Sequence, residues 1–143
     1  RPNCAADTAS VAMAACPCGL PADYRQCCGR FHAGAYYLQA PTPEALMRSR
    51  YSAYVLGLRD YLLDTWHPST RPEQMERFDS GVKWLGLTVK RAWTTSDSEG
   101  FVEFVARNRP PGGGPAQRLE ELSRFVRDAS SGGHWQYVDA VAE

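Results

Sequence analysis

Residues 101–107 read Phe-Val-Glu-Phe-Val-Ala-Arg, a run of aromatic and β-branched residues that is typical of a β-strand. Successive side chains of a strand point to opposite faces. One face of this predicted strand is therefore apolar and carries Val102 and Phe104. The other face carries the charged residues Glu103 and Arg107.

Three further segments have a similar composition, and they cover residues 82–95, 119–127 and 135–141. The Gly-, Pro- or Ser-rich segments between the four runs are typical of hairpin turns. Consecutive hairpins predict an antiparallel sheet. Gly86, in the middle of the first strand, indicates a bulge or a bend, so we expect the sheet to be concave on one side and to offer a place for a ligand.

Residues 42–80, upstream of the strands, have the pattern of helices. Thr42 and Pro43 are typical of an N-cap and a first helical turn, and apolar residues then recur at helical spacing as far as Gly57. Two shorter helices should follow, the second of them over residues 72–79. Helices that precede a meander of strands predict an α+β fold, in which N-terminal helices pack on one face of a strongly curved antiparallel sheet.

The composition excludes several classes of protein. The chain has 143 residues, of which 43% are hydrophobic, and its 16 Lys and Arg residues balance its 16 Asp and Glu residues. This length suits one domain with a single core, and the apolar fraction argues against intrinsic disorder. Zero net charge disfavours nucleic-acid binding and capture by acidic membranes. No apolar run approaches the roughly 18 residues of a membrane-spanning helix.

Four of the five cysteines lie close together in the sequence, as Cys16, Cys18, Cys27 and Cys28. Two closely spaced pairs of thiolates can fill the tetrahedral shell of Zn²⁺, and a shell filled by protein ligands is structural rather than catalytic. The alternatives are two disulfides or uncoordinated thiols, and His32 is a possible replacement ligand. Because clustered cysteines favour a reduced metal site over a disulfide framework, we expect a cytoplasmic protein.

The sequence divides into three parts. Residues 1–15 are predicted to be a flexible leader that carries Cys4 as a free thiol. Residues 16–34 form the predicted zinc knuckle, and residues 42–142 form the α+β domain.

The spacing Cys-x-Cys, eight residues, Cys-Cys resembles the SEC-C motif, and the whole chain resembles the YchJ family. In that family a SEC-C motif precedes a domain with the nuclear transport factor 2-like (NTF2-like) fold. The segments that carry the resemblance are 16–34, 45–54, 60–68, 84–87, 101–107, 123–127 and 137–139. The resemblance implies a cone-like sheet closed by helices, and it implies no particular activity.

Polar and aromatic residues are the candidates for the lining of the cone. They are Arg50, Tyr54, Trp66, His67, Trp84, Glu103, Glu121, Ser123, Arg124 and Asp139. A carboxylate that is desolvated by aromatic neighbours could act as a general base. The alternative is that the charged strand residues form cross-strand ion pairs or face solvent. Of Arg48 and Arg50, we expect one to reach the sheet or an anionic ligand and the other to be solvated.

Two functional hypotheses follow. The first is a zinc-containing adaptor or binding protein, in which the knuckle docks a protein partner and the curved domain is a scaffold or a pocket for a small ligand. The alternative is an enzyme of the isomerase, dehydratase or hydrolase type with an acidic or histidine general base in the cone.

Overall fold

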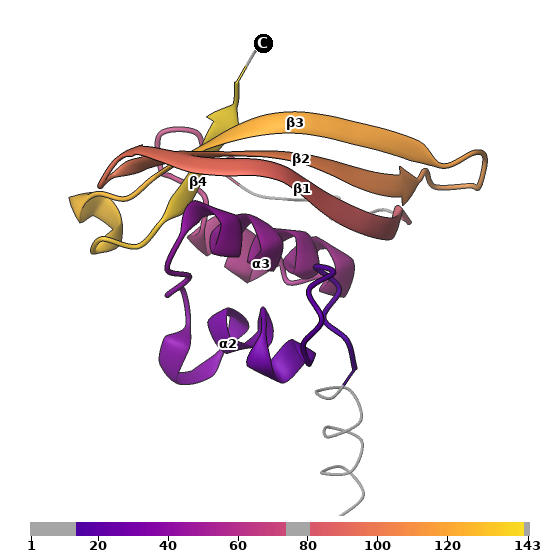
Figure 1. Ribbon diagram of the computed structural model, residues 1–143, viewed down its shortest axis with the longest axis horizontal. Helices are drawn as coiled ribbons and strands as arrows, with labels where there is room; N and C mark the ends of the chain where they lie inside the picture. The colour runs from indigo at the N-terminus through magenta and orange to yellow at the C-terminus, as the bar shows by residue number, and fades with distance from the viewer. Residues whose placement is uncertain (1–13, 74–80, 142–143) are drawn as a thin grey trace, which may run out of the picture.

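The four predicted strands form one antiparallel sheet in the order β1-β2-β3-β4 in the computed structural model, which describes residues 14–73 and 81–141. The strands are β1 (Lys83–Ser96), β2 (Glu99–Arg109), β3 (Gln117–Val126) and β4 (Gln136–Ala140). Each observed strand end lies within two residues of the predicted one. The predicted α+β fold is confirmed, with helices on one face of a curved sheet (Figure 1).

Gly86 interrupts β1 where the sequence predicts a bend. The pairing register between β1 and β2 shifts between Trp84 and Gly86, and Gly86 has a φ of +155°. A Cβ atom at this position would lie 2.5 Å from Nη2 of Arg107 on β2. Glycine therefore allows both the backbone conformation and the approach of the Arg107 side chain.

Helix α3 (Pro43–Leu56) lies beneath the concave face of the sheet (Figure 1). Its first turn is capped by Thr42, whose Oγ1 accepts a hydrogen bond of 3.0 Å from the backbone N–H of Ala45. Gly57 ends the helix in the left-handed conformation, with a φ of +76°. A short helix α4 (Arg59–Asp64) follows. The predicted helix over residues 72–79 lies largely outside the described residues.

The hydrophobic core lies between α3 and the sheet. Leu46 and Met47 of α3 are buried, as are Val102 and Phe104 on the apolar face of β2 and Phe125 of β3. Burial of a side chain of this size stabilises a fold by about 1.5–3 kcal/mol. These contacts set the distance between α3 and the sheet.

In the described part of the chain, no helix is long and apolar enough to cross a membrane.

The N-terminal knuckle lies on the side of α3 that faces away from the sheet (Figure 1). It contains η1 (Tyr24–Gln26), α2 (Gly29–His32) and η2 (Gly34–Tyr36). The backbone N–H of Tyr24 donates to the carbonyl of Ala14, and Ala15 pairs with Asp23 in an isolated bridge. The residues from position 14 onward thus belong to the knuckle, while residues 1–13 of the predicted leader lie outside the described residues.

Candidate metal centre

Short backbone hydrogen bonds bring the two cysteine pairs together. Gly19, with a φ of +94°, allows the chain to turn directly after Cys18, and its N–H donates to the carbonyl of Cys16. On the other side, η1 ends at Cys27, and Cys28 is the N-cap residue of α2. Local turns alone therefore place both pairs opposite each other.

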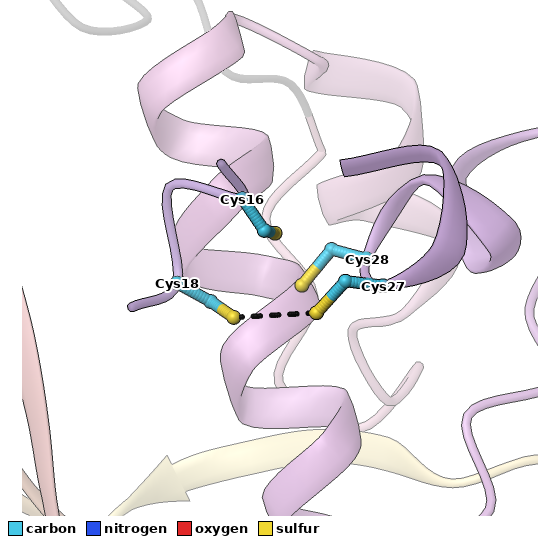
Figure 2. A group of neighbouring side chains, drawn as sticks. All are labelled: Cys16, Cys18, Cys27 and Cys28. Atoms are coloured by element: carbon cyan, nitrogen blue, oxygen red, sulfur yellow. Dashed lines mark hydrogen bonds between the residues drawn. The ribbon is translucent and has the colours of Figure 1, made fainter. Parts of the chain in front are cut away.

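The four cysteine sulfurs form a compact, buried cluster (Figure 2). Their Sγ atoms all lie within 4.8 Å of one another, and the Sγ atoms of Cys18 and Cys27 are 3.6 Å apart. All four residues are free cysteines and at most 6% exposed. Metal–sulfur bonds of about 2.3 Å in a tetrahedron give sulfur–sulfur distances of about 3.8 Å. The cluster therefore fits a four-coordinate metal ion.

The electrostatics of the cluster favour a cation among the four sulfurs. The thiols of Cys18 and Cys28 hydrogen-bond to the sulfur of Cys16 and lower the pKa of Cys16 well below its usual value. The same hydrogen bonding raises the pKa of Cys28, and burial raises the pKa of Cys27 to about 12. Without a metal, the neighbours thus stabilise one thiolate, whereas four thiolates so close together need a positive charge among them.

His32 does not act as a replacement ligand, because both of its ring nitrogens are engaged elsewhere. Nε2 lies 2.8 Å from the carbonyl oxygen of Ser49, and Nδ1 lies 2.6 Å from the hydroxyl of Tyr24. A carbonyl can only accept, so Nε2 carries the proton and Nδ1 accepts from Tyr24. Burial lowers the pKa of His32, which favours this neutral form. The imidazole therefore ties α2 to α3.

Further contacts join the cluster to α3. Arg48 donates from Nη1 to the carbonyl of Cys18 at 2.9 Å and forms an ion pair of 3.0 Å with Glu44. Ser52 of α3 is buried and its Oγ lies 3.5 Å from Sγ of Cys16. Arg48 is thus bound to the knuckle rather than solvated, in contrast to what the sequence predicts for one of the two arginines.

A cavity of 260 Å³ lies on the other side of α3, between this helix and the sheet. The structure brings six of the ten predicted lining residues to this cavity. They are Arg50, Tyr54, Trp66, Trp84, Glu121 and Ser123. Most of the cavity wall is apolar, which is typical of a site for a small organic ligand.

Glu121 and Ser123 lie side by side on β3 and form the main polar pair of this cavity. Ser123 Oγ donates to Oε2 of Glu121 at 2.6 Å, and the hydroxyl of Tyr137 lies 3.4 Å from the same oxygen. Tyr137 in turn packs edge-on against Trp66, with ring centroids 5.3 Å apart. The carboxylate thus holds one aromatic wall of the cavity in place.

The other four predicted lining residues lie outside this cavity. Glu103 is on the opposite face of the sheet, as its place in the alternation of β2 requires, and it pairs with Arg91 at 2.6 Å. His67 forms a hydrogen bond of 2.9 Å with Asp128. Arg124 lies 3.5 Å from Asp139. Glu103, Arg124 and Asp139 thus form the cross-strand ion pairs that were the alternative interpretation of the strand charges, whereas His67 lies outside the strands.

Sequence patterns alone do not single out several residues of the cavity wall. Tyr51, Phe104, Leu119 and Tyr137 line it in addition to the predicted residues. Tyr51 belongs to the apolar stripe of α3, and Phe104 to the apolar face of β2. Their places on these apolar faces could have indicated them, but residues that only fill the core show the same pattern, so the pattern does not identify a cavity wall.

Comparisons with known proteins agree with this architecture. Residues 42–140 match the family model described as YchJ, middle NTF2-like domain. The chain is 57% identical over 126 residues to a UPF0225 protein of Bordetella parapertussis, a match that covers 88% of this chain and 91% of that protein. It is 55% identical over 134 residues to a UPF0225 protein of Chromobacterium violaceum, with 91% and 94% covered.

Two solved structures have the same fold. A SEC-C motif containing protein from Rhodopseudomonas palustris superposes with a TM-score of 0.77 at 35% identity, covering 91% of this chain and 99% of that one. A SEC-C motif containing protein from Psychrobacter arcticus gives a TM-score of 0.74 at 31% identity, covering 94% and 86%. The resemblance seen in the sequence is confirmed, and the chain belongs to the YchJ (UPF0225) family, with a SEC-C cysteine motif ahead of an NTF2-like domain.

Proposed function

We propose that this protein is a zinc-containing binding protein that holds a small organic ligand between α3 and the sheet. The zinc is structural and fixes the knuckle against the outer side of α3. The observation that carries the proposal is the position of α3, which has the cysteine cluster on one side and the cavity on the other.

The donor set supports zinc as the metal. Four buried cysteine sulfurs provide soft ligands in a shell that leaves no position for substrate or water, as in structural zinc sites. Reduced cysteines persist in a reducing compartment, so the proposed site belongs in the cytoplasm. Arg30 supports the site from outside, because its Nε donates to the carbonyl of Cys27 at 3.0 Å.

The cavity supports the binding of a small ligand. It is smaller than most drug-sized pockets, which are about 300–1,000 Å³, and it is enclosed mainly by aromatic and apolar side chains. The indole N–H groups of Trp66 and Trp84 are buried without a hydrogen-bond partner among the described residues. Both indole rings belong to the cavity wall, so contact of a ligand with these rings should change their NMR signals.

Native mass spectrometry and NMR, both on protein purified without chelator, test the two parts of this proposal. The mass should correspond to about one zinc ion per chain. In the NMR titration, small aromatic compounds should shift the indole signals of Trp66 and Trp84. Cys28→Ser should abolish zinc binding, whereas Cys4→Ser, which changes none of the four clustered cysteines, should leave it intact. If the wild type and Cys4→Ser both contain no metal, the zinc assignment is wrong.

A second candidate function is catalysis with Glu121 as general base. The hydrogen bonds from Ser123 and Tyr137 orient its carboxylate at the cavity wall, which is an arrangement that general-base catalysis requires. Turnover of a bound compound by the wild type, and its loss in Glu121→Gln with binding retained, would favour the enzyme over the binding protein.

A protein partner is proposed for the outer side of the knuckle. Leu20 is 40% exposed there, and Arg25 is also exposed. Affinity capture with the wild type and with Cys27→Ser/Cys28→Ser should give different partners, because the variant cannot hold this surface in shape. The same partners with both proteins would count against docking through the knuckle.

A further inference from the structure

Arg50 is a charged residue in the interior of the protein. It is 6% exposed, it comes from α3, and it lines the cavity. Both hydrogen bonds that its guanidinium donates to described residues leave from Nη1, to the carbonyl of Leu62 at 2.8 Å and to Oγ1 of Thr65 at 2.7 Å. These two bonds fix the orientation of the group.

Aromatic rings cover the guanidinium, but within the described residues no carboxylate pairs with it. Its Cζ lies 5.0 Å from the ring centroid of Trp66 and 4.8 Å from that of Tyr137. No carboxylate oxygen of residues 14–73 or 81–141 lies within 4.0 Å of its nitrogens. Cation–π contacts are worth about 0.5–2 kcal/mol each, which compensates only part of the loss of hydration of a buried charge.

Glu121 does not serve as the missing partner. Its carboxylate lines the same cavity, but its Oε2 accepts from Ser123 and Tyr137 rather than from Arg50. Burial lowers the pKa of Arg50, and the charge of Glu121 raises that pKa without a direct contact. The carboxylate also holds the ring of Tyr137 that covers the guanidinium. Among the described residues, Nε and Nη2 of Arg50 donate no hydrogen bond, so both can bind a ligand.

The surroundings of Arg50 define the rest of the ligand. The wall next to it consists of aromatic rings and apolar side chains, among them Tyr51, Phe104 and Phe125. A complementary compound therefore has a flat apolar body and an acceptor group with a negative charge.

We propose that the cavity binds a small aromatic carboxylate and that Arg50 recognises its carboxylate group. This inference rests on the proposed role of the cavity as a site for a small ligand. The guanidinium offers a planar pair of donors that matches a carboxylate, and burial strengthens such charge-assisted hydrogen bonds. The aromatic rings around Arg50 hold the apolar body of the compound.

Phenylacetate and phenylacetamide test the inference, because the two compounds have nearly the same shape and differ in charge. Each is titrated into the full-length, zinc-loaded protein while the indole N–H signals are followed by NMR. We expect phenylacetate to bind at least about tenfold more tightly than phenylacetamide. The signals of Trp66 and Trp84 should shift, and that of Trp93, which stacks on Phe101 on the other face of the sheet, should not.

Two variants separate the charge of Arg50 from an arginine charge outside the cavity. Arg50→Met removes the charge and keeps an apolar side chain, so both compounds should bind it with similar affinity. Arg124→Met is the matched control, because Arg124 lies outside the cavity beside Asp139, and it should keep the preference for phenylacetate. If Arg50→Met fails to fold, the affinities of the wild type for phenylacetate and phenylacetamide still test whether the cavity prefers a carboxylate.

The outcomes distinguish this inference from the proposed function. Equal binding of the two compounds to the wild type, or a preference that persists in Arg50→Met, overturns recognition of a carboxylate and leaves a pocket for neutral ligands. If neither compound shifts the Trp66 and Trp84 signals, both the inference and the small-ligand role of the cavity are overturned.

Discussion

Arg48 and Arg50 stand two positions apart on α3 and serve opposite sides of the helix. Two residues span about 200° of an α-helix, so their side chains leave in opposite directions. Arg48 binds the carbonyl of Cys18 in the knuckle, and Arg50 lines the cavity below the sheet. At the scale of single residues, α3 therefore connects the metal centre with the proposed ligand site.

Gly29 is a residue on which the geometry of the cluster depends. A Cβ atom at this position would lie 2.7 Å from the carbonyl oxygen of Tyr24 and 2.9 Å from a ring carbon of Tyr24. Because Gly29 directly follows Cys28, Gly29→Ala must displace either η1 or the start of α2. We expect a loss of about 1–3 kcal/mol in the free energy of unfolding and weaker zinc retention in a competition with chelator.

Gly34→Ala is the matched control for this prediction. A Cβ atom at Gly34 meets no heavy atom within 4 Å, but its φ of +85° makes alanine strained. The variant should lose about 1–2 kcal/mol of stability and retain zinc like the wild type. Equal zinc retention in Gly29→Ala and Gly34→Ala would show that the close packing at Gly29 does not shape the site.

The sequence is informative about single residues wherever local spacing decides their position. Cys16, Cys18, Cys27 and Cys28 are close in the chain, so their spacing alone predicts the cluster. Glu103 and Glu121 illustrate the limit: both are acidic residues on strands, yet one pairs with Arg91 on the far face and the other lines the cavity. Which face is concave depends on the placement of α3, and single-residue patterns do not contain that information.

At the scale of elements, α3 is defined by its ends. Thr42 caps the first turn, Pro43 starts the helix, and Gly57 ends it in the left-handed conformation. These signals are local, and the sequence predicts them correctly. The bulge at Gly86 is predicted as well, but the further register shift of β1 between Val89 and Arg91 depends on pairing with β2 and has no glycine to mark it.

Thr42→Ala tests how strongly the cap stabilises α3. The variant loses the hydrogen bond from the N–H of Ala45, so we expect the free energy of unfolding to fall by about 1 kcal/mol in a denaturant titration. Thr42→Ser keeps the hydroxyl and should be close to the wild type. Equal stabilities of the alanine and serine variants would contradict a role for the cap.

At the scale of the whole molecule, the sheet, α3 and the knuckle form successive layers (Figure 1). The sheet has a large hydrophobic interface with α3. The knuckle is held by the cysteine cluster, which also contacts Leu87 of β1, by the buried Phe31 of α2, and by polar contacts such as His32 with Ser49. Loss of the metal should therefore destabilise the knuckle more than the sheet. The sequence predicts a knuckle over residues 16–34, but not on which side of α3 it packs.

Removal of the metal by a chelator should loosen the knuckle and α3 but leave the central strands folded. We expect hydrogen–deuterium exchange to rise over residues 14–40 and on α3, because the four thiols no longer share a cation. The central strands β2 and β3 should keep their protection, since their apolar face remains buried. Unchanged exchange in the knuckle after complete metal removal would mean that the cysteines alone hold it together.

We expect one structural zinc ion, which fixes the knuckle to α3, to be enclosed by Cys16, Cys18, Cys27 and Cys28. X-ray absorption at the zinc edge, on protein purified without chelator, measures the ligands of the metal directly. We predict four sulfur neighbours at about 2.3 Å and no nitrogen neighbour. A zinc ion with a histidine nitrogen or a water oxygen in its shell, or a protein without zinc, would contradict this account.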